Sequence, residues 1–343
     1  MLAMVLEEYG RQLTKRDIPI PVPGPGEVLL RVLACGVCGT DVKIAAGKIQ
    51  TARTPLIMGH EPVGRVIECG PGVTGFLPGD RVAVWIYVTC GTCEHCLKGR
   101  HVLCPGLRRV GFERPGGFSE YMVVPAANLV AIPDSITDTE AAVLGCAVST
   151  MFRAVNTRGR VQPGEWVLVM GVGGLGVHGV QIGKSVGARV IAVDVDERRL
   201  ELATRYGADE ALPFSERALD ADVRMITGGR GADVVLETVG LGNTLSVSMA
   251  CLGSGGRLVM VGYSPSSPFE VESPRVVLDE IEIIGSRAMT RKELIGAIDL
   301  LARGAVKAVV SACYPLEDVN VALEELRQGR VMGRAVLVPA VND

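Results

Sequence analysis

The first 147 residues carry short apolar runs that alternate with polar positions and are broken by glycine and proline. Such runs occupy residues 27–33, 64–68 and 80–86, and turn signals such as Pro-Gly-Pro-Gly at 23–26 separate them. Alternation is typical of strands buried on one face, whereas glycine and proline clusters are typical of turns. The pattern predicts a mostly β domain.

From residue 148 the pattern changes to a regular succession of strand, loop and helix. The expected elements are strands at 166–170, 189–194, 232–237 and 256–262, with helices ending near 186, at 197–206 and at 244–252. The run at 166–170 is continuously apolar, as in a strand covered on both faces. This succession predicts an α/β fold with a doubly wound parallel sheet. An amphipathic segment at 292–303 and a last strand at 334–338 follow.

Composition and charge narrow the class of protein. The 343 residues suffice for about two domains, and 48% hydrophobic with 21% charged residues excludes wholesale disorder. The net charge of −3 disfavours a nucleic-acid partner. The N-terminus lacks the features of a signal peptide, and the uncharged stretch 166–183 contains a glycine turn, so we expect a cytoplasmic protein without a membrane span. Cysteine clusters in that reducing setting are more often metal or catalytic sites than disulfides.

A glycine-rich loop lies between the strand at 166–170 and the helix after it. Its residues are Gly171, Val172, Gly173, Gly174, Leu175 and Gly176. Glycines at this spacing permit the tight turn, the approach of a pyrophosphate and close helix–strand packing. Asp194 ends the next strand and can accept hydrogen bonds from a ribose, which favours NAD over NADP. Arg198 and the candidate cofactor residue Arg199 lie near enough to keep NADP open.

The strongest indication of a metal site in the sequence is a group of four closely spaced cysteines, Cys90, Cys93, Cys96 and Cys104. Four thiolates without an open position are typical of a structural zinc site. Pro105 follows the last cysteine as in bacterial ferredoxins, but an iron–sulfur cluster of that kind has a shorter last spacing. His101 could compete as a ligand, although a surface histidine is the favoured interpretation.

Two further motifs contain cysteine and histidine, but composition alone does not connect them. They are Cys38-Gly-Thr40-Asp41 and Gly59-His60-Glu61. Together with Gly72-Val-Thr-Gly-Phe76, Gly79-Asp-Arg-Val82, the four cysteines, Gly116-Gly-Phe-Ser-Glu-Tyr121, the glycine loop and Asp194, they make the whole chain resemble the zinc-dependent medium-chain alcohol dehydrogenases.

This resemblance implies a second, catalytic zinc held by Cys38, His60 and Cys146, so that each subunit would hold two zinc ions. Glu61 would lie close to the metal, and Asp41 would orient the histidine. The implied reaction is reversible hydride transfer from a primary or secondary alcohol to NAD, giving an aldehyde or ketone, with the Thr40 hydroxyl passing the proton toward the nicotinamide ribose.

The resemblance also implies domain limits and further roles. A GroES-like catalytic domain would comprise residues 1–147 and 287–343, and a Rossmann domain residues 148–286. Arg334 would reach the pyrophosphate, and Ile49 and Trp85 are candidates for the substrate pocket. Lys43 stands near the position where well-known members have the histidine that ends the proton relay, so the route of proton release is open. A homodimer or homotetramer is expected, with pairing near residues 280–285.

Two alternatives remain beside the simple alcohol dehydrogenase. A polyol, threonine or other specialised secondary-alcohol dehydrogenase belongs to the same superfamily, although polyol-acting relatives often replace the third thiolate with an acid, which disfavours them here. A non-catalytic nucleotide or redox sensor would keep the fold without the chemistry. The open metal position and Thr40 argue against a sensor.

Overall fold

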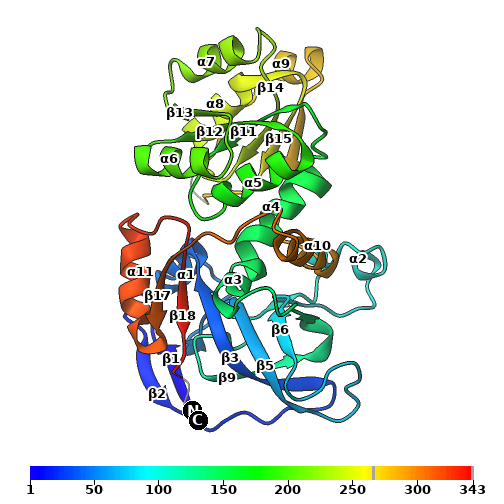
Figure 1. The fold of residues 1–343 in the computed structure, drawn as a ribbon, viewed down its shortest axis with the longest axis vertical. Coiled ribbons are helices and arrows are strands. Elements are labelled where there is room, and N and C mark those ends of the chain that lie inside the picture. Colours follow the sequence, from blue (N-terminus) through cyan, green and yellow to red (C-terminus); the bar gives the residue numbers. More distant parts are fainter. Residues whose placement is uncertain (265–266, 341–343) are drawn as a thin grey trace. The chain divides into compact units, whose positions relative to one another are not determined.

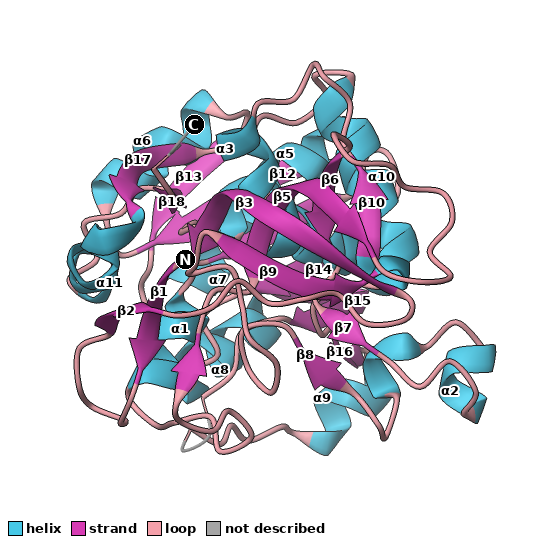
Figure 2. Ribbon diagram, turned by 90° about the horizontal axis from the view of Figure 1, so that it is seen from below, coloured by secondary structure: helices cyan, strands magenta, loops and turns pink. Residues whose placement is uncertain are grey.

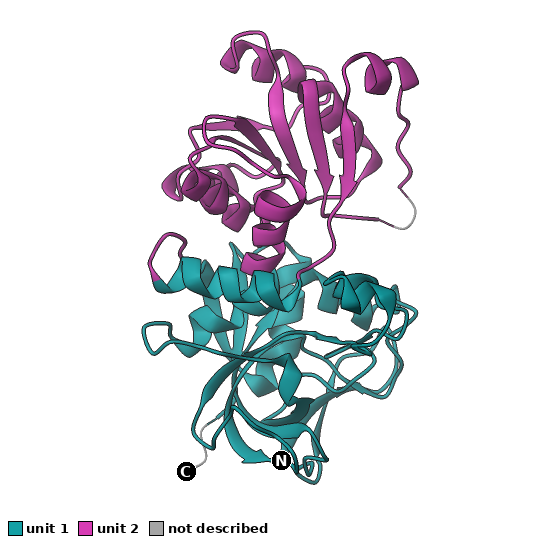
Figure 3. Cartoon of the chain, turned by 90° about the vertical axis from the view of Figure 1, so that its right-hand side faces the viewer, with its two compact units in different colours: residues 1–146, 290–302, 308–343 teal, residues 147–289, 303–307 magenta. Residues whose placement is uncertain are grey.

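The computed structural model describes residues 1–264 and 267–340 (Figure 1). The chain divides into two compact units (Figure 3). The first combines residues 1–146, 290–302 and the C-terminal segment from Ala308, and the second combines residues 147–289 and 303–307.

A seven-stranded sheet forms the centre of the first unit (Figure 2). Its order is β10-β6-β5-β3-β18-β17, and β9 pairs with β3 outside this path. The strands are β3 (Glu27–Val37), β5 (Glu61–Cys69), β6 (Arg81–Val84), β9 (Tyr121–Pro125), β10 (Leu129–Ala131), β17 (Val310–Pro315) and β18 (Arg334–Val338). The long strand β3 pairs with β5, β9 and β18, all antiparallel, and therefore organises the sheet.

Smaller elements complete the first unit. A three-stranded sheet holds β1 (Leu2–Leu6), β2 (Thr14–Asp17) and β4 (Leu56–Ile57), and β7 (Tyr87–Val88) pairs with β8 (Arg108–Arg109). The α-helices are α1 (Gly39–Ala45), α2 (Glu94–Leu97), α3 (Asp138–Ala142), α10 (Arg291–Ala302) and α11 (Val319–Arg327). Short 3-10 turns are η1 (His101–Leu103), η2 (Ala126–Asn128) and η5 (Leu316–Asp318). The π-helical turn η3 (Leu144–Val148) contains Cys146 and continues into the first residues of the second unit.

The second unit is built on a six-stranded parallel sheet in the order β13-β12-β11-β14-β15-β16. The strands are β11 (Trp166–Met170), β12 (Arg189–Asp194), β13 (Glu210–Pro213), β14 (Ala232–Glu237), β15 (Leu252–Met260) and β16 (Glu282–Gly285). The helical elements are α4 (Ser149–Phe152), η4 (Arg153–Arg158), α5 (Gly176–Val186), α6 (Glu197–Arg205), α7 (Leu219–Ile226), α8 (Gly242–Cys251) and α9 (Ser273–Leu278). The strand order reverses between β11 and β14, and such a switch point is where open α/β sheets bind ligands.

The expected α/β fold with a doubly wound parallel sheet is confirmed, and the predicted strands at 166–170, 189–194, 232–237 and 334–338 coincide with β11, β12, β14 and β18. The sequence did not predict β13, α7 or α11. These elements are short and bury few side chains, so they offer few buried apolar positions by which an element can be recognised.

The C-terminal strand returns to the sheet beside the strand that ends near Cys38. Residues Ala335 and Leu337 of β18 lie opposite Val37 and Cys35 of β3. All five residues of β18 are buried or nearly so. This pairing carries Arg334 into the interior of the first unit, where it meets Glu61.

Candidate metal centres and cofactor loop

Cys38 lies at the junction between the end of β3 and the start of α1. Its backbone is extended (φ −116°, ψ 154°), so it precedes the first helical residue. Asp41, three residues later, turns back and accepts the Cys38 backbone N–H on Oδ2 at 2.8 Å. This carboxylate–backbone bond fixes the direction in which the chain leaves the strand, and with it the position of the thiol.

His60 follows a glycine that its turn requires. Gly59 has φ +92°, and a Cβ atom there would overlap Phe118. The imidazole Nδ1 lies 3.0 Å from Oδ1 of Asp41, and both side chains are buried. Because the carboxylate accepts the Nδ1 proton, Nε2 keeps a lone pair for a metal. Asp41 therefore holds two of the candidate ligands, one by its backbone and one by its ring.

Glu61 begins β5 and is completely buried. Its Oε1 lies 3.6 Å from His60 Nε2, and its Oε2 accepts a hydrogen bond from Arg334 Nε at 3.1 Å. Burial raises the pKa of this carboxyl to about 7, although the neighbouring Arg334 charge opposes the rise. Within the part of the chain that the structure describes, Glu61 Oε1 accepts no well-aligned hydrogen bond, and it forms an ion pair with Arg334 Nη2.

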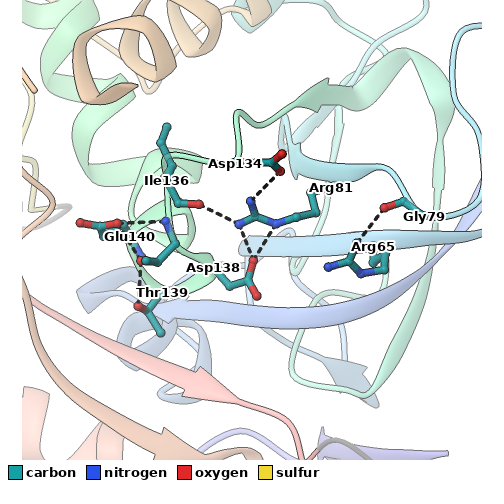
Figure 4. A network of polar contacts seen from close by, with 9 residues as sticks. Arg65, Gly79, Arg81, Asp134, Ile136, Asp138, Thr139 and Glu140 are labelled. Atoms are coloured by element: carbon teal, nitrogen blue, oxygen red, sulfur yellow. Dashed lines mark hydrogen bonds and ion pairs between the residues drawn. The ribbon is translucent and has the colours of Figure 1, made fainter. Parts of the chain in front are cut away.

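A polar network fixes the segment that leads to Cys146 (Figure 4). Arg81 of β6 donates two hydrogen bonds to Asp138 Oδ1, at 3.0 and 2.6 Å, and one to the Ile136 carbonyl at 2.8 Å. Thr137 and Glu140 form a reciprocal capping box at the start of α3. No sequence motif indicates this role of Arg81, since an arginine in a strand carries no motif of its own.

These elements bring four ligand-type side chains together. The candidate ligand atoms of Cys38, His60, Glu61 and Cys146 all lie within 4.8 Å of one another. A hydrogen bond from Cys146 is the main reason why the pKa of Cys38 lies well below its ordinary value, while the same bond raises the pKa of Cys146. The pair thus already favours one thiolate. Two sulfurs and one imidazole nitrogen suit zinc with a position left open, and the Glu61 carboxylate is the fourth candidate ligand of the cluster.

Thr40 lies in the first turn of α1, two residues after Cys38, and is half-buried. Lys43 lies one helical turn further on. Both therefore belong to the helix that begins at the metal cluster, and their place in a proton route stays a prediction.

Arg334 is almost completely buried at the metal cluster. In addition to the bond from Nε, its Nη2 lies 2.9 Å from Glu61 Oε1. The side chain thus neutralises a buried carboxylate beside the thiols, a function that the sequence analysis did not foresee because the two residues are 273 positions apart. Its expected contact with a pyrophosphate stays a prediction.

The four-cysteine loop forms a second cluster, with all four Sγ atoms within 4.8 Å of one another. The Sγ atom of Cys90 lies 3.9 Å from that of Cys96 and 3.5 Å from that of Cys104. Tetrahedral zinc with Zn–S bonds of about 2.3 Å requires sulfurs roughly 3.8 Å apart, and none of the four is in a disulfide. The residues therefore fit a structural zinc ion. His101 packs its ring against Trp85 instead, with centroids 5.5 Å apart.

Replacing Cys93 with serine is expected to remove one zinc ion per chain and lower the melting temperature, because metal binding supplies folding free energy to small metal-held loops. Backbone N–H groups of Thr92 and Cys93 lower the pKa of Cys90 to about 6, whereas burial raises the pKa of Cys96 to about 11. Zinc analysis and a thermal melt measure both effects.

Cys313, an exposed cysteine outside both clusters, gives the matched control for this variant. Cys313→Ser should keep the metal content and melting temperature of the unmodified chain. A visible absorption band in the purified protein would contradict zinc and indicate an iron–sulfur cluster.

The glycine loop joins β11 to α5 in the second unit. Gly171 has φ +84°, and a Cβ atom on Gly176 would overlap the Gly171 carbonyl oxygen. His178, buried in α5, lies with Nδ1 3.0 Å from the Gly174 carbonyl oxygen. An N–H at that position donates to the loop and holds its shape. No sequence motif indicates this bond.

Asp194 lies at the end of β12, directly beside the loop. Its Oδ2 accepts the Val172 N–H at 2.9 Å and its Oδ1 accepts the Asp196 N–H at 3.1 Å. Arg199 Nη1 lies 3.6 Å from the same carboxylate, and Arg198 forms paired hydrogen bonds with Asp196. Both arginines thus have carboxylate partners within their own unit.

The two pocket candidates lie in the first unit. Trp85 is 5% exposed, and its ring also packs edge to face with Tyr87 at 6.1 Å. Ile49 is half-buried and packs against the hydrophobic core. Their contribution to a substrate pocket stays a prediction.

Comparisons with known proteins agree with this arrangement. Residues 24–134 match the alcohol dehydrogenase GroES-like domain, and residues 174–303 match the zinc-binding dehydrogenase domain. An alcohol dehydrogenase of Geobacillus stearothermophilus is 38% identical over 98% of this chain and 99% of its own length. The acryloyl-coenzyme A reductase of Metallosphaera sedula is 33% identical over 98% and 99%. A crystal structure of an NAD-dependent alcohol dehydrogenase superposes with a TM-score of 0.93 at 34% identity, over 98% and 99% of the two chains.

The class defined by the fold and the metal-type clusters is that of two-domain oxidoreductases with a GroES-like and a Rossmann domain. The chain belongs to the zinc-dependent medium-chain alcohol dehydrogenase family, as the motif resemblance predicted. No helix of residues 1–264 and 267–340 is both long and apolar enough to cross a membrane.

Proposed function

We propose that this oxidoreductase is a zinc-dependent, NAD-dependent alcohol dehydrogenase that interconverts a primary or secondary alcohol and an aldehyde or ketone. The observation that carries the proposal is the set of Cys38, His60, Glu61 and Cys146, of which the first three are buried and Cys146 is half-buried, with ligand atoms within 4.8 Å of one another. Asp41 prepares this set in advance by holding Cys38 and His60. A preorganised set with a position left open suits catalysis better than structure.

Different residues of the chain would bind the metal, compensate charge and accept the proton in this reaction. A bound zinc ion would supply Lewis acidity and NAD would accept the hydride. Cys38, His60 and Cys146 would hold the metal, and Arg334 offsets the negative charge of Glu61 nearby. The Thr40 hydroxyl, on the helix that starts at the cluster, would receive the proton that the substrate hydroxyl loses.

The cofactor preference rests on Asp194. A carboxylate at the end of β12 suits the ribose hydroxyls of NAD and repels the 2′-phosphate of NADP. Arg198 and Arg199, which could attract that phosphate, are already paired with Asp196 and Asp194. We also propose that the chain acts as a homodimer or homotetramer and holds two zinc ions per subunit.

A second candidate is the reduction of a coenzyme A thioester. The relative from Metallosphaera sedula is named for that activity. The observation in this chain that favours it is a cavity lined by Arg53 and Arg108, since guanidinium groups suit the phosphates of such a substrate.

A substrate screen tests these proposals. Primary, secondary, aromatic and polyol alcohols and threonine are offered with NAD and with NADP, and acryloyl-coenzyme A is offered with NADH. We expect NADH absorbance to rise with a primary or secondary alcohol and kcat/KM to be higher for NAD than for NADP. Oxidation of NADH by the thioester alone would favour the second candidate. NAD binding without turnover of any substrate would indicate a sensor.

A further inference from the structure

A cavity of about 860 Å³ lies in the first unit, between residues 50–57 and residues 107–115. Part of its wall is apolar and comes from Leu56, Ile57, Leu107 and Phe112. Pockets of this size hold organic molecules of about the size of a drug or nucleotide. A simple alcohol occupies only a small part of such a volume, so the cavity exceeds what the proposed reaction needs.

The charges that line the cavity leave an excess of positive charge. Arg114 pairs with Glu27 at 2.8 Å, and Glu113 is bound by Arg109 through its side chain and backbone. These two pairs are neutral. Arg53 and Arg108 remain, both exposed, and within residues 1–264 and 267–340 neither takes part in an ion pair or a side-chain hydrogen bond.

The cavity shares a wall with the metal cluster. The ring of Phe112, which lines the cavity, lies 5.3 Å from the ring of His60, measured between centroids. The Arg109 guanidinium lies 3.9 Å above the same Phe112 ring and donates a hydrogen bond to the Thr51 hydroxyl. Arg109 therefore ties the two segments together and keeps the Phe112 wall in place.

We propose that this cavity binds a phosphorylated organic group of the substrate, with its phosphates on Arg53 and Arg108 and its organic part against the apolar wall. This inference rests on the proposed function, because it assumes that the reacting end of the substrate lies at the metal cluster. Arginine binds phosphate through two parallel N–H donors, so two free guanidinium groups at one cavity suit a phosphate ester or pyrophosphate. The substrate class is thereby narrowed to alcohols, carbonyl compounds or thioesters that carry phosphate.

Calorimetric titration of the full-length, NAD-saturated chain tests the proposal, since bound NAD occupies the other phosphate-binding loop. Coenzyme A serves as the organic phosphate and inorganic pyrophosphate as the bare anion. We expect coenzyme A to bind more tightly than pyrophosphate, Arg53→Gln and Arg108→Gln each to weaken it about tenfold, and the double variant to abolish binding. Arg11→Gln, which removes an exposed arginine outside the cavity, should leave binding unchanged.

Undiminished binding of coenzyme A to the double variant, or none to the unmodified chain, would overturn the proposal. Equal affinities for pyrophosphate and coenzyme A would overturn the role of the apolar wall. The arginines are exposed, so thermal melts of the variants should match the unmodified chain and show that a loss of binding is local. A separate assay of alcohol oxidation distinguishes failure of the proposed function from failure of this inference. If no alcohol is oxidised but coenzyme A still binds in a way that depends on the two arginines, only the proposed function is rejected.

Discussion

Cys38→Ser and Cys146→Ser should each reduce the zinc content from two ions to one per chain and lower kcat/KM by more than about 100-fold. The expected loss of kcat/KM is larger for a direct metal ligand than for a residue that orients a ligand. Loss of a group that merely orients a ligand costs typically about 10–100-fold in metal affinity or activity, so Asp41→Asn is expected to fall in that range. Loss of a thiolate from a set of two sulfurs and one nitrogen removes a direct bond, and the effect must be larger.

Cys35 provides the matched control for these two variants. It lies on β3, the strand that leads to Cys38, and is completely buried. Its thiol is not part of either metal-type cluster. Cys35→Ala should therefore retain both zinc ions and most of the activity. Metal analysis together with NADH absorbance measures the outcome, and two retained zinc ions with unchanged kcat/KM in Cys38→Ser would refute the ligand set.

Gly176→Ala should destabilise the second unit by about 3 kcal/mol and lower its melting temperature by about 6–12 °C. The added Cβ atom would overlap the Gly171 carbonyl oxygen, which belongs to the backbone and cannot rotate away as a side chain can. The loop would have to move, and NAD binding should be lost together with stability. Differential scanning calorimetry and fluorescence titration with NADH measure the two effects.

Gly173→Ala separates cofactor binding from folding in the same loop. A Cβ atom at this position meets only Arg199 Nη1, at 3.9 Å, which is an ordinary contact. The melting temperature should therefore stay within about 1–2 °C of that of the unmodified chain. NAD should bind at least about tenfold more weakly, because the methyl group stands where the pyrophosphate approaches the backbone. Full NAD affinity in this variant would show that the loop does not contact the pyrophosphate.

The elements that could be predicted from sequence are those whose signal is local. Strands β11, β12 and β14 are buried on both faces and stand out as apolar runs between a glycine loop and helices. The short elements β13 and α7 were missed, because β13 has only four residues and α7 buries only Leu219 and Val223. The surroundings of Trp85 could not be predicted from the sequence either, because only the structure shows that its ring packs against the rings of Tyr87 and His101.

The sequence by itself determined the four-cysteine loop and the glycine loop, because in each the interacting groups follow one another along the chain and their spacing alone defines the geometry. Motif resemblance could name Cys38, His60 and Cys146, but only the tertiary structure brought their ligand atoms within 4.8 Å of one another. The pairing of β18 with β3 decided that Arg334 meets Glu61 across 273 positions. Contacts of that kind depend on strand register, and no local pattern of residues encodes the partner.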